Sequence, residues 1–301
     1  MLSCVATGLP PVCALAPDGS SVWALLLEYD GGPFVGWQRQ DSGLSVQEVV
    51  EAAAAQLNNG AKVAATVAGR TDSGVHAAGQ VVALPLRPGF RPRQVRDALN
   101  YHMKPHPVVV VRAAPAPEGW NPRFSAVQRS YRYVILNRRA RPALLLGHAW
   151  HVATPLRAEA MHAAAQLLLG KHDFTSFRAA ACQAKSPVRT LERLDVTREG
   201  DVITIIAEAR SFLHHQVRNL VGTLRLVGEG RWPVERVAAV LQAHDRSAAG
   251  PTAPAEGLCL MRVVYPIDPF QPDDRRSGPL AAGNIPGHGE TFSDLTTGHE
   301  P

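Results

Sequence analysis

Cysteine is rare in this chain of 301 residues, and the four cysteines have none of the spacings of a metal site. Cys4, Cys13, Cys182 and Cys259 include no Cys-x-x-Cys pair, the usual start of a structural zinc site. Two of them lie in a proline-containing N-terminal stretch. The sequence therefore predicts neither a disulfide framework nor a metal centre.

Long apolar stretches are also lacking. No segment reaches the ~18 consecutive apolar residues that a membrane-spanning helix requires. The first twenty residues lack the basic start of a secretory signal, and Pro10, Pro11 and Pro17 interrupt their apolar run. We therefore expect no membrane association and a location in the reducing cytoplasm.

Lysine is scarce, since only four of the 31 basic residues are lysines and the other 27 are arginines. The formal net charge is +5. The planar guanidinium group of arginine fits phosphate, which makes nucleic acid a reasonable partner. A proteome rich in alanine, arginine and proline would produce the same count, so charge alone leaves both explanations open.

Apolar residues make up 46% of the chain, and their periodicity predicts an α+β protein. Ser45 and Glu48 have the spacing of a capping box. Strands are predicted over 22–30, 61–69, 79–86, 107–114, 129–137, 191–209 (a hairpin) and 257–266, and helices over 45–57, 91–102, 157–170, 212–228 and 233–243.

The order of these elements predicts two α+β domains of similar build, residues 21–118 and 119–267, although the two sequences show no clear repeat. Residues 1–20 and 268–301 lack periodicity. The second of these segments is rich in Pro, Gly, Asp and Ser. We expect both segments to be disordered.

Residues 69–76, Gly-Arg-Thr-Asp-Ser-Gly-Val-His, separate two predicted strands. The triplet Asp-Ser-Gly is good turn chemistry, so a simple turn is the plainest interpretation. However, Arg70, Asp72 and His76 are crowded among small residues that let a ligand approach the backbone, at a strand end where reactive groups are often placed. Asp72 could then act as a nucleophile or base, with Arg70 available for phosphate.

Arginine and aromatic residues alternate between residues 119 and 136. They are Trp120, Arg123, Phe124, Arg129, Tyr131, Arg132 and Tyr133. Because guanidinium groups bind phosphate and rings stack on bases, the pattern favours a nucleic-acid surface. A half-buried strand would explain the alternation of Tyr131 and Tyr133 equally well, but not the turn Trp-Asn-Pro-Arg-Phe before it.

Residues 212–219, Phe-Leu-His-His-Gln-Val-Arg-Asn, begin a predicted helix. On that helix His214 and Arg218 would share a face, whereas His214 and His215 would point about 100° apart and could not bind one metal ion together. An arginine beside an apolar stripe is usually a surface residue. Arg218 becomes functionally interesting only if it pairs with a carboxylate held elsewhere.

With these motifs the sequence resembles the tRNA pseudouridine synthase A family. The resemblance covers about residues 23 to 265. One matching motif could arise by chance, but here six segments match in the order in which the family has them. They are EYDGGPFVGWQRQ with SVQEVVE, GRTDSGVHAAGQV, RFSAVQRSYRYVILN, LLLGKHDFTSFRAA, SFLHHQVRNLVGTL and AEGLCL. The chain departs from the family's usual residues at Ser73, at Asn121-Pro122 and at Cys259.

The resemblance implies an isomerase that converts uridine to pseudouridine in the tRNA anticodon stem-loop, at nucleotide positions 38, 39 and 40. The bond from ribose to N1 breaks, the base rotates, and C5 bonds to the same sugar carbon, without metal or cofactor. The implied fold has two similar halves, ferredoxin-like or RRM-like. They form one extended antiparallel sheet with helices on one face and a central basic cleft. Two chains would form a homodimer that reads tRNA by shape.

The resemblance also implies roles for individual residues. Asp72 would be the catalytic nucleophile, Arg218 the cation that keeps it ionised, and Tyr131 the ring under the uracil. The other residues expected to contact RNA are Arg70, Trp120, Asn121, Pro122, Arg123, Phe124, Gln183 and Lys185. An ionised carboxylate suits the reaction, because cleavage of a glycosidic bond develops positive charge at the sugar.

Two other classes of protein remain open from the sequence. A non-catalytic RNA-binding protein or RNA chaperone would carry the same arginines and aromatic residues, but it would have no use for Asp72, which repels phosphate. An N-glycoside hydrolase would use similar carboxylate chemistry and release the free base. Analysis of the product separates the hydrolase from the isomerase.

Overall fold

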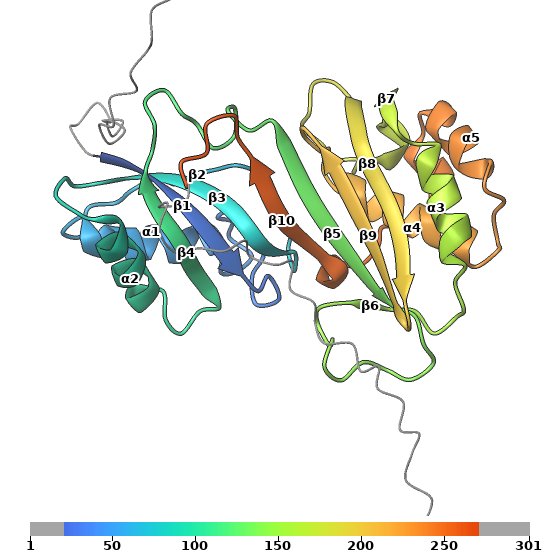
Figure 1. Cartoon of the computed structure of the whole chain (residues 1–301), viewed down its shortest axis with the longest axis horizontal. Helices are drawn as coiled ribbons and strands as arrows, with labels where there is room; N and C mark the ends of the chain where they lie inside the picture. The colour runs from blue at the N-terminus through green and yellow to red at the C-terminus, as the bar shows by residue number, and fades with distance from the viewer. Residues whose placement is uncertain (1–20, 271–301) are drawn as a thin grey trace, which may run out of the picture. The chain divides into compact units, whose positions relative to one another are not determined.

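The computed structural model describes residues 21–270, which belong to one compact unit. These residues form a ten-stranded, mostly antiparallel sheet and five α-helices, in strand order β4-β1-β3-β10-β5-β9-β8-β7 (Figure 1). The short strands β2 and β6 pair with β3 and β5. The predicted α+β class is confirmed.

The strands are β1 (Ser21–Tyr29), β2 (Thr66–Val67), β3 (His76–Leu86), β4 (Val108–Pro115), β5 (Gln128–Leu136), β6 (Trp150–His151), β7 (Gly170–Asp173), β8 (Val188–Glu199), β9 (Val202–Ala209) and β10 (Leu258–Val264). The helices are α1 (Val46–Leu57), α2 (Pro92–His102), α3 (Ala158–Gln166), α4 (Gln216–Gly228) and α5 (Arg236–Ala243). No helix within residues 21–270 is long and apolar enough to cross a membrane.

Helix α1 begins where the capping-box spacing predicted. The Ser45 side chain accepts a hydrogen bond from the Glu48 backbone N–H, and the Glu48 carboxylate accepts one from the Ser45 N–H at 2.9 Å. These bonds satisfy two of the free donors at the helix start. The apolar face of the helix, which begins with Val46 and Val49, is buried in the hydrophobic core.

Four features differ from the sequence-based expectation. The strand predicted over 61–69 is reduced to β2, and α3 ends at Gln166, so that Gly170 begins β7. The helix predicted from residue 212 begins only at Gln216. Strands β6 and β7 were not predicted, because two and four residues are too few to show an alternating pattern.

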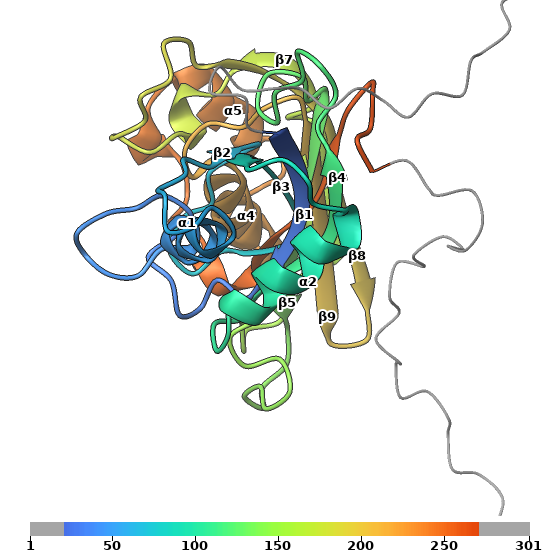
Figure 2. The ribbon, with the colours of Figure 1, turned by 90° about the vertical axis from the view of Figure 1, so that its left-hand side faces the viewer.

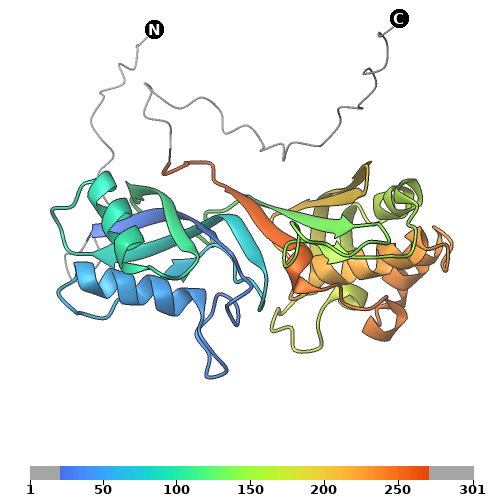
Figure 3. The ribbon, with the colours of Figure 1, turned by 90° about the horizontal axis from the view of Figure 1, so that it is seen from below.

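Strand β10 determines which distant segments meet. It pairs in parallel with β3, where Cys259 lies opposite His76, and antiparallel with β5, where Leu260 lies opposite Tyr131. Seen from below, β10 runs through the middle of the sheet, between the strands that precede and follow it in the strand order (Figure 3). The last strand of the described chain thus places the loop before β3 beside β5.

The helices pack in groups on the sheet. α1 contacts α2, and α3 contacts both α4 and α5. In the end-on view α1, α4 and α5 lie on the same side of the strands (Figure 2). The start of α4 lies next to the loop that precedes β3, because His215, the N-cap residue of α4, contacts Asp72 in that loop.

The predicted disordered segments fall largely outside the described residues. Residues 1–20 and 271–301 lie outside the described residues. Phe270 is buried, and its backbone N–H donates to the Asp268 carboxylate at 2.8 Å. The packed unit therefore continues three residues past the boundary at residue 267.

Candidate active site

The loop between β2 and β3, residues 68–75, is a tight turn held by its neighbours. The Val75 N–H donates to the Asp72 carbonyl at 3.1 Å, and Gly74 has a positive φ of 77°. The Trp37 N–H donates to the Thr71 carbonyl at 3.0 Å. Gly36 approaches so closely that a Cβ there would lie 2.8 Å from the Thr71 oxygen, and its φ of 110° also favours glycine.

Buried polar side chains hold the same loop from below. The Tyr29 hydroxyl and the Thr71 hydroxyl lie 2.8 Å apart. The Gln80 amide, fully buried, donates to the Gly69 carbonyl at 2.8 Å and to the Tyr29 oxygen at 3.2 Å. Burial raises the pKa of Tyr29 to about 12, so its hydroxyl keeps its proton. The backbone that carries Asp72 is therefore fixed.

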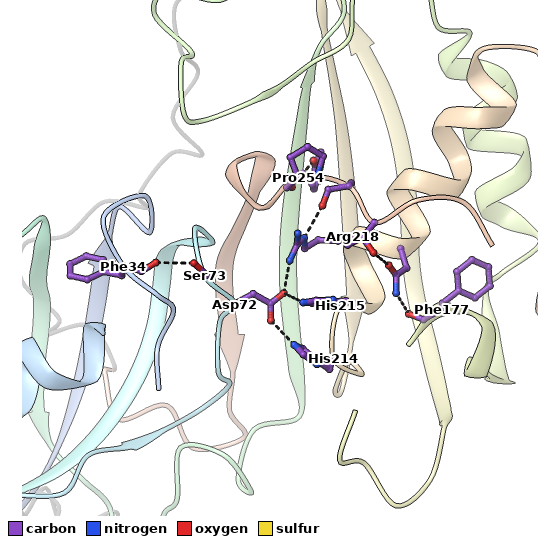
Figure 4. Close-up of polar contacts among 12 residues, drawn as sticks. Phe34, Asp72, Ser73, Phe177, His214, His215, Arg218 and Pro254 are labelled. Carbon is purple, nitrogen blue, oxygen red and sulfur yellow. Dashed lines mark hydrogen bonds and ion pairs between the residues drawn. The ribbon is translucent and has the colours of Figure 1, made fainter. Parts of the chain in front are cut away.

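The Asp72 carboxylate lies at the centre of a cluster of cationic and imidazole groups (Figure 4). The Arg218 Nη1 lies 3.1 Å from Oδ2, the His215 Nε2 lies 3.4 Å from Oδ2, and the His214 Nε2 lies 3.4 Å from Oδ1. The Arg218 Nε donates to the Ala253 carbonyl at 2.8 Å, which fixes the direction of the guanidinium group. Arg218 thus pairs with a carboxylate from a distant segment, which was the condition for a functional role of this residue.

The two histidines correct an expectation from the sequence. They precede α4 instead of lying on it, and His215 adopts a left-handed conformation with a φ of 60°. Their ring centroids are 4.0 Å apart, and both rings face Asp72. The prediction that the two side chains diverge is therefore wrong. Burial lowers the pKa of His215, although the negative charge of Asp72 opposes this shift.

Two groups of residues within 21–270 have donor atoms close enough to hold a metal ion. In the first, the donor atoms of Asp72, His214 and His215 lie within 4.8 Å of one another, but the guanidinium of Arg218 already contacts the same carboxylate. The second group is Asp30, His76 and His148. There the His76 Nε2 contacts the Gly147 and Glu256 carbonyls at 2.9 and 3.1 Å, so this imidazole already has backbone partners.

Tyr131 lies on β5 with its ring beside the Asp72 loop. Its ring packs edge-on against Phe212, with centroids 5.3 Å apart, and a Cβ placed on Gly69 would lie 4.0 Å from the Tyr131 hydroxyl oxygen. Burial, with smaller effects from Tyr29 and Asp72, raises the pKa of Tyr131 well above its usual range. The phenol is therefore neutral at physiological pH.

Arg129 is buried and ties three segments together. Its Nη2 donates to the Ala68 carbonyl at 2.7 Å and to the Arg123 carbonyl at 2.9 Å, and its Nη1 donates to the Arg210 carbonyl. Burial lowers its pKa. From the sequence, Arg129 was noted only as part of the alternation of arginine and aromatic residues between residues 119 and 136. Its position two residues before Tyr131, on the same face of β5, is the signal that could have identified it.

These segments surround a depression of about 1330 Å³. Asp72 and Tyr131 line it, and Asp72 is the only carboxylate among the described residues that do so. The lining arginines are Arg39, Arg70, Arg123, Arg129, Arg189, Arg210 and Arg218. The surface around Asp72 is thus strongly cationic.

The structure divides the predicted RNA-contacting residues into two sets. Arg70, Arg123, Phe124 and Gln183 line the depression, and the Phe124 side chain is exposed. The described residues that line the depression do not include Trp120, Asn121, Pro122 and Lys185.

Three of the non-lining residues hold the turn that presents Arg123 and Phe124. The Asn121 side chain accepts hydrogen bonds from the backbone N–H groups of both residues, at 2.9 and 3.1 Å. The Tyr265 hydroxyl donates to the Pro122 carbonyl at 2.7 Å, and the Trp120 ring packs on the Tyr265 ring with centroids 5.1 Å apart. Sequence reasoning missed His214, His215 and Arg129 as parts of this site.

Comparison with known proteins gives consistent results. A family model described as tRNA pseudouridine synthase matches residues 26–125 and 164–266, which include Asp72 and Arg218. The tRNA pseudouridine synthase A of Acidiphilium cryptum (strain JF-5) is 68% identical over 249 residues, covering 82% of this chain and 98% of that protein. The namesake from Gluconobacter oxydans (strain 621H) is 55% identical over 260 residues, covering 85% and 94%.

Proposed function

The chain belongs to the tRNA pseudouridine synthase family and isomerises uridine to pseudouridine in tRNA, and we propose that Asp72 carries this reaction. The observation that supports this role is the isolation of Asp72, as the one described carboxylate in a depression lined by seven arginines. A carboxylate there repels RNA phosphates and weakens binding. Its presence is explained by chemistry, which a non-catalytic RNA-binding protein would not need.

The proposed reaction begins when the target nucleotide leaves its stack and enters the depression. Extrusion of a base costs a few kcal/mol, which contacts to the RNA must supply. The C1′–N1 bond then breaks, and the ionised carboxylate of Asp72 stabilises the positive charge at the sugar, as nucleophile or as base. The uracil rotates, C5 bonds to C1′ and loses its proton, and N1, which has left the sugar, takes up a proton. Product and substrate contain the same atoms, so no external oxidant or reductant is consumed.

Arg218 has the role of orienting the Asp72 carboxylate and compensating its negative charge. Its guanidinium is held by the Ala253 carbonyl as well as by Asp72, and only 15% of its side chain is exposed. An arginine that served only to bind RNA phosphate would gain from being free of carboxylates. His214 and His215 add a polar contact to each oxygen of the same carboxylate.

The remaining residues would bind the RNA. The Tyr131 ring provides a flat partner for the flipped uracil, since base–ring stacking is worth about 1–3 kcal/mol. Arg70, Arg123 and Gln183 would contact the strand, and the exposed Phe124 could fill the gap left by the extruded base. Trp120, Asn121 and Pro122 would act through the turn they support, and Lys185 would contact RNA outside the depression.

The finer organisation also belongs to this proposal. Residues 21–118 and 119–267 would be two ferredoxin-like halves, joined through β10, with helices on one face and a central basic cleft that receives the anticodon stem-loop. Support comes from the strand order, in which β4, β1 and β3 lie on one side of β10 and β5, β9, β8 and β7 on the other. A homodimer in the cytoplasm that modifies tRNA positions 38, 39 and 40 completes the proposal, by resemblance to the family.

The product of one turnover tests the proposal against a hydrolase. The purified chain is incubated with unmodified tRNA transcript labelled in uridine, and the digest is separated into nucleosides and free bases. We expect pseudouridine and no free uracil. Release of uracil would instead identify an N-glycoside hydrolase that uses the same carboxylate.

A further inference from the structure

A second hollow, of about 210 Å³, adjoins the depression that contains Asp72. It lies at β7 and β8, beside the end of β9, at the edge of the sheet (Figure 1). Its lining residues are Lys171, Val188, Arg189, Thr190, Arg210 and Ser211. Arg189, Arg210 and Ser211 line both hollows, so the two share a wall.

The pairing of the strands places these residues at the same edge of the sheet, with Lys171 and Thr190 on one face of the β7–β8 ladder and Arg189 on the other. In the β7–β8 ladder, Lys171 lies opposite Thr190 and His172 lies opposite Arg189. Arg210 and Ser211 directly follow β9, whose last residue pairs with β8. This edge of the sheet thus has three cationic side chains and two hydroxyl groups around one small space, with no carboxylate among the described lining residues.

The cations of this hollow have no acidic partner among the described residues, as is the case for every described arginine except seven. Among residues 21–270, Lys171, Arg189 and Arg210 make no ion pair. The arginines that pair with Asp or Glu are Arg39, Arg96, Arg138, Arg193, Arg218, Arg225 and Arg231. Like charges gathered without a counter-charge repel one another, and a bound anion would remove that repulsion.

Arg189 is the clearest example of a cation in this hollow without a negative partner. Its Nη1 donates to the Ser186 and Val188 carbonyls at 3.0 and 2.7 Å, so the side chain is held in place. Its Nε is buried without a hydrogen-bond partner in the described structure. Burial lowers its pKa, and Cys182 opposes this shift only in part. An oxyanion in the hollow would supply the missing negative charge.

We propose that this hollow binds a backbone phosphate of the same RNA whose target uridine reaches Asp72. The inference rests on the proposed function, because it takes the RNA in the larger depression as given. Phosphates recur at every nucleotide, so a strand that crosses the shared wall presents one to Lys171, Arg189 and Arg210. Binding there fixes the distance along the strand from the anchored phosphate to the reacting nucleotide. The hollow therefore helps to select which uridine is modified.

Lys171 gives the cleanest test, because it is exposed and lines only the smaller hollow. The Kd for tRNA is measured against KCl concentration for the parent, Lys171→Ala, Lys171→Glu and Arg210→Ala. Each loss of a phosphate contact should raise Kd roughly three- to tenfold at moderate salt and reduce the slope of log Kd on log[KCl] by about 0.7–0.9. Lys171→Glu should bind more weakly than Lys171→Ala. Single-turnover rates at saturating tRNA, measured beside Kd, separate a loss of binding from a loss of chemistry.

Arg93→Ala is the matched control, since it removes one positive charge from an exposed position on α2 outside both hollows. It should change the salt slope by less than half as much as Lys171→Ala. A second arm uses anticodon stem-loops that carry one uncharged methylphosphonate at successive positions. At one position, the losses from the methylphosphonate and from Lys171→Ala should not add, because both remove the same contact.

Three results would overturn the inference. The first is a parental Kd and salt slope in both Lys171→Glu and Arg210→Ala. The second is full additivity at every methylphosphonate position. The third is Lys171-dependent binding of inorganic phosphate at concentrations that leave tRNA binding unchanged, which would assign the hollow to a free anion. A parent protein that forms no pseudouridine would refute the proposed function instead, so the two failures can be told apart.

Discussion

The carboxylate of Asp72 and the guanidinium of Arg218, 146 residues apart in the chain, lie 3.1 Å from each other. Each is fixed by its own surroundings: the Asp72 loop by the Trp37 N–H, and Arg218 by the Ala253 carbonyl. The pair is therefore prearranged, and a substrate would meet an oriented, charge-compensated carboxylate.

Replacement of Arg218 by leucine should abolish most turnover while tRNA still binds. Loss of one charged donor at a reacting group typically slows the chemical step by about 100-fold or more. Single-turnover rates at saturating tRNA, measured beside Kd, separate chemistry from binding. If Arg218→Leu instead weakened Kd and left the saturating rate intact, Arg218 would be a phosphate ligand.

Tyr131 should act through its ring and not as a proton acceptor. Burial raises the pKa of Tyr131 far above neutrality, so its hydroxyl cannot take a proton from C5 at physiological pH. Tyr131→Phe should bind tRNA and keep most of the parental rate. Tyr131→Leu should be nearly inactive, because it loses stacking worth about 1–3 kcal/mol together with the shape of the site. Full activity of Tyr131→Leu would show that the ring is only a core residue of β5.

Arg129 should contribute to stability as well as to the site. Arg129→Met removes a buried cation that donates to three backbone carbonyls, and we expect a loss of about 2–4 kcal/mol in the free energy of unfolding. Urea denaturation measures this loss. Arg123→Ala is a suitable comparison, because Arg129 bonds to the backbone of residue 123. That variant should keep its stability and lose tRNA affinity, and equal stability of both variants would refute the tethering role.

His215 should make the fold sensitive to acid. Its pKa is lowered by burial, while Asp72 opposes the shift and His214, Arg218 and Arg246 reinforce it. The unfolded chain, with an ordinary histidine pKa near 6.5, therefore takes up the proton at a higher pH than the folded chain does. Stability should fall as pH drops below about 6.5 and should be unaffected by this group above it.

The corresponding variant is His215→Gln, compared with His102→Gln, which alters an exposed histidine on α2. Urea denaturation at pH 7.5 and pH 5.0 gives the difference in unfolding free energy for each protein. His215→Gln should show a smaller loss at pH 5.0 than the parent does. An unchanged difference would mean that protonation of His215 is not coupled to folding.

Local patterns in the sequence predicted much of the fold. The Ser45–Glu48 spacing located the start of α1, and the hairpin predicted over 191–209 is formed by β8 and β9, which turn at Gly200, where φ is positive. Such features depend on interactions between residues that are close in sequence. The short strand β7 escaped because four residues carry too little pattern.

The arrangement of the site was less accessible from the sequence. Asp72 was singled out from the residues of its loop, and the resemblance to the family gave the roles of Asp72 and Arg218. Their contact depends on β10, the last strand in the sequence, which pairs in parallel with β3. His214 and His215 were misjudged because the helical pattern of α4 was extended backwards through them. The left-handed backbone at His215 turns both rings toward Asp72. Histidine is enriched in this conformation among non-glycine residues, but the conformation is too rare for the residue type alone to locate it.

Base-resolution mapping of pseudouridine in tRNA incubated with the parent and with Asp72→Asn tests the central claim most directly. The substitution keeps the size of the side chain and removes its charge, so tRNA should bind as tightly as to the parent, or more tightly. The account predicts that the parent modifies uridines in the anticodon stem-loop and that Asp72→Asn modifies none, at equal occupancy. Robust pseudouridine formation by Asp72→Asn would contradict it.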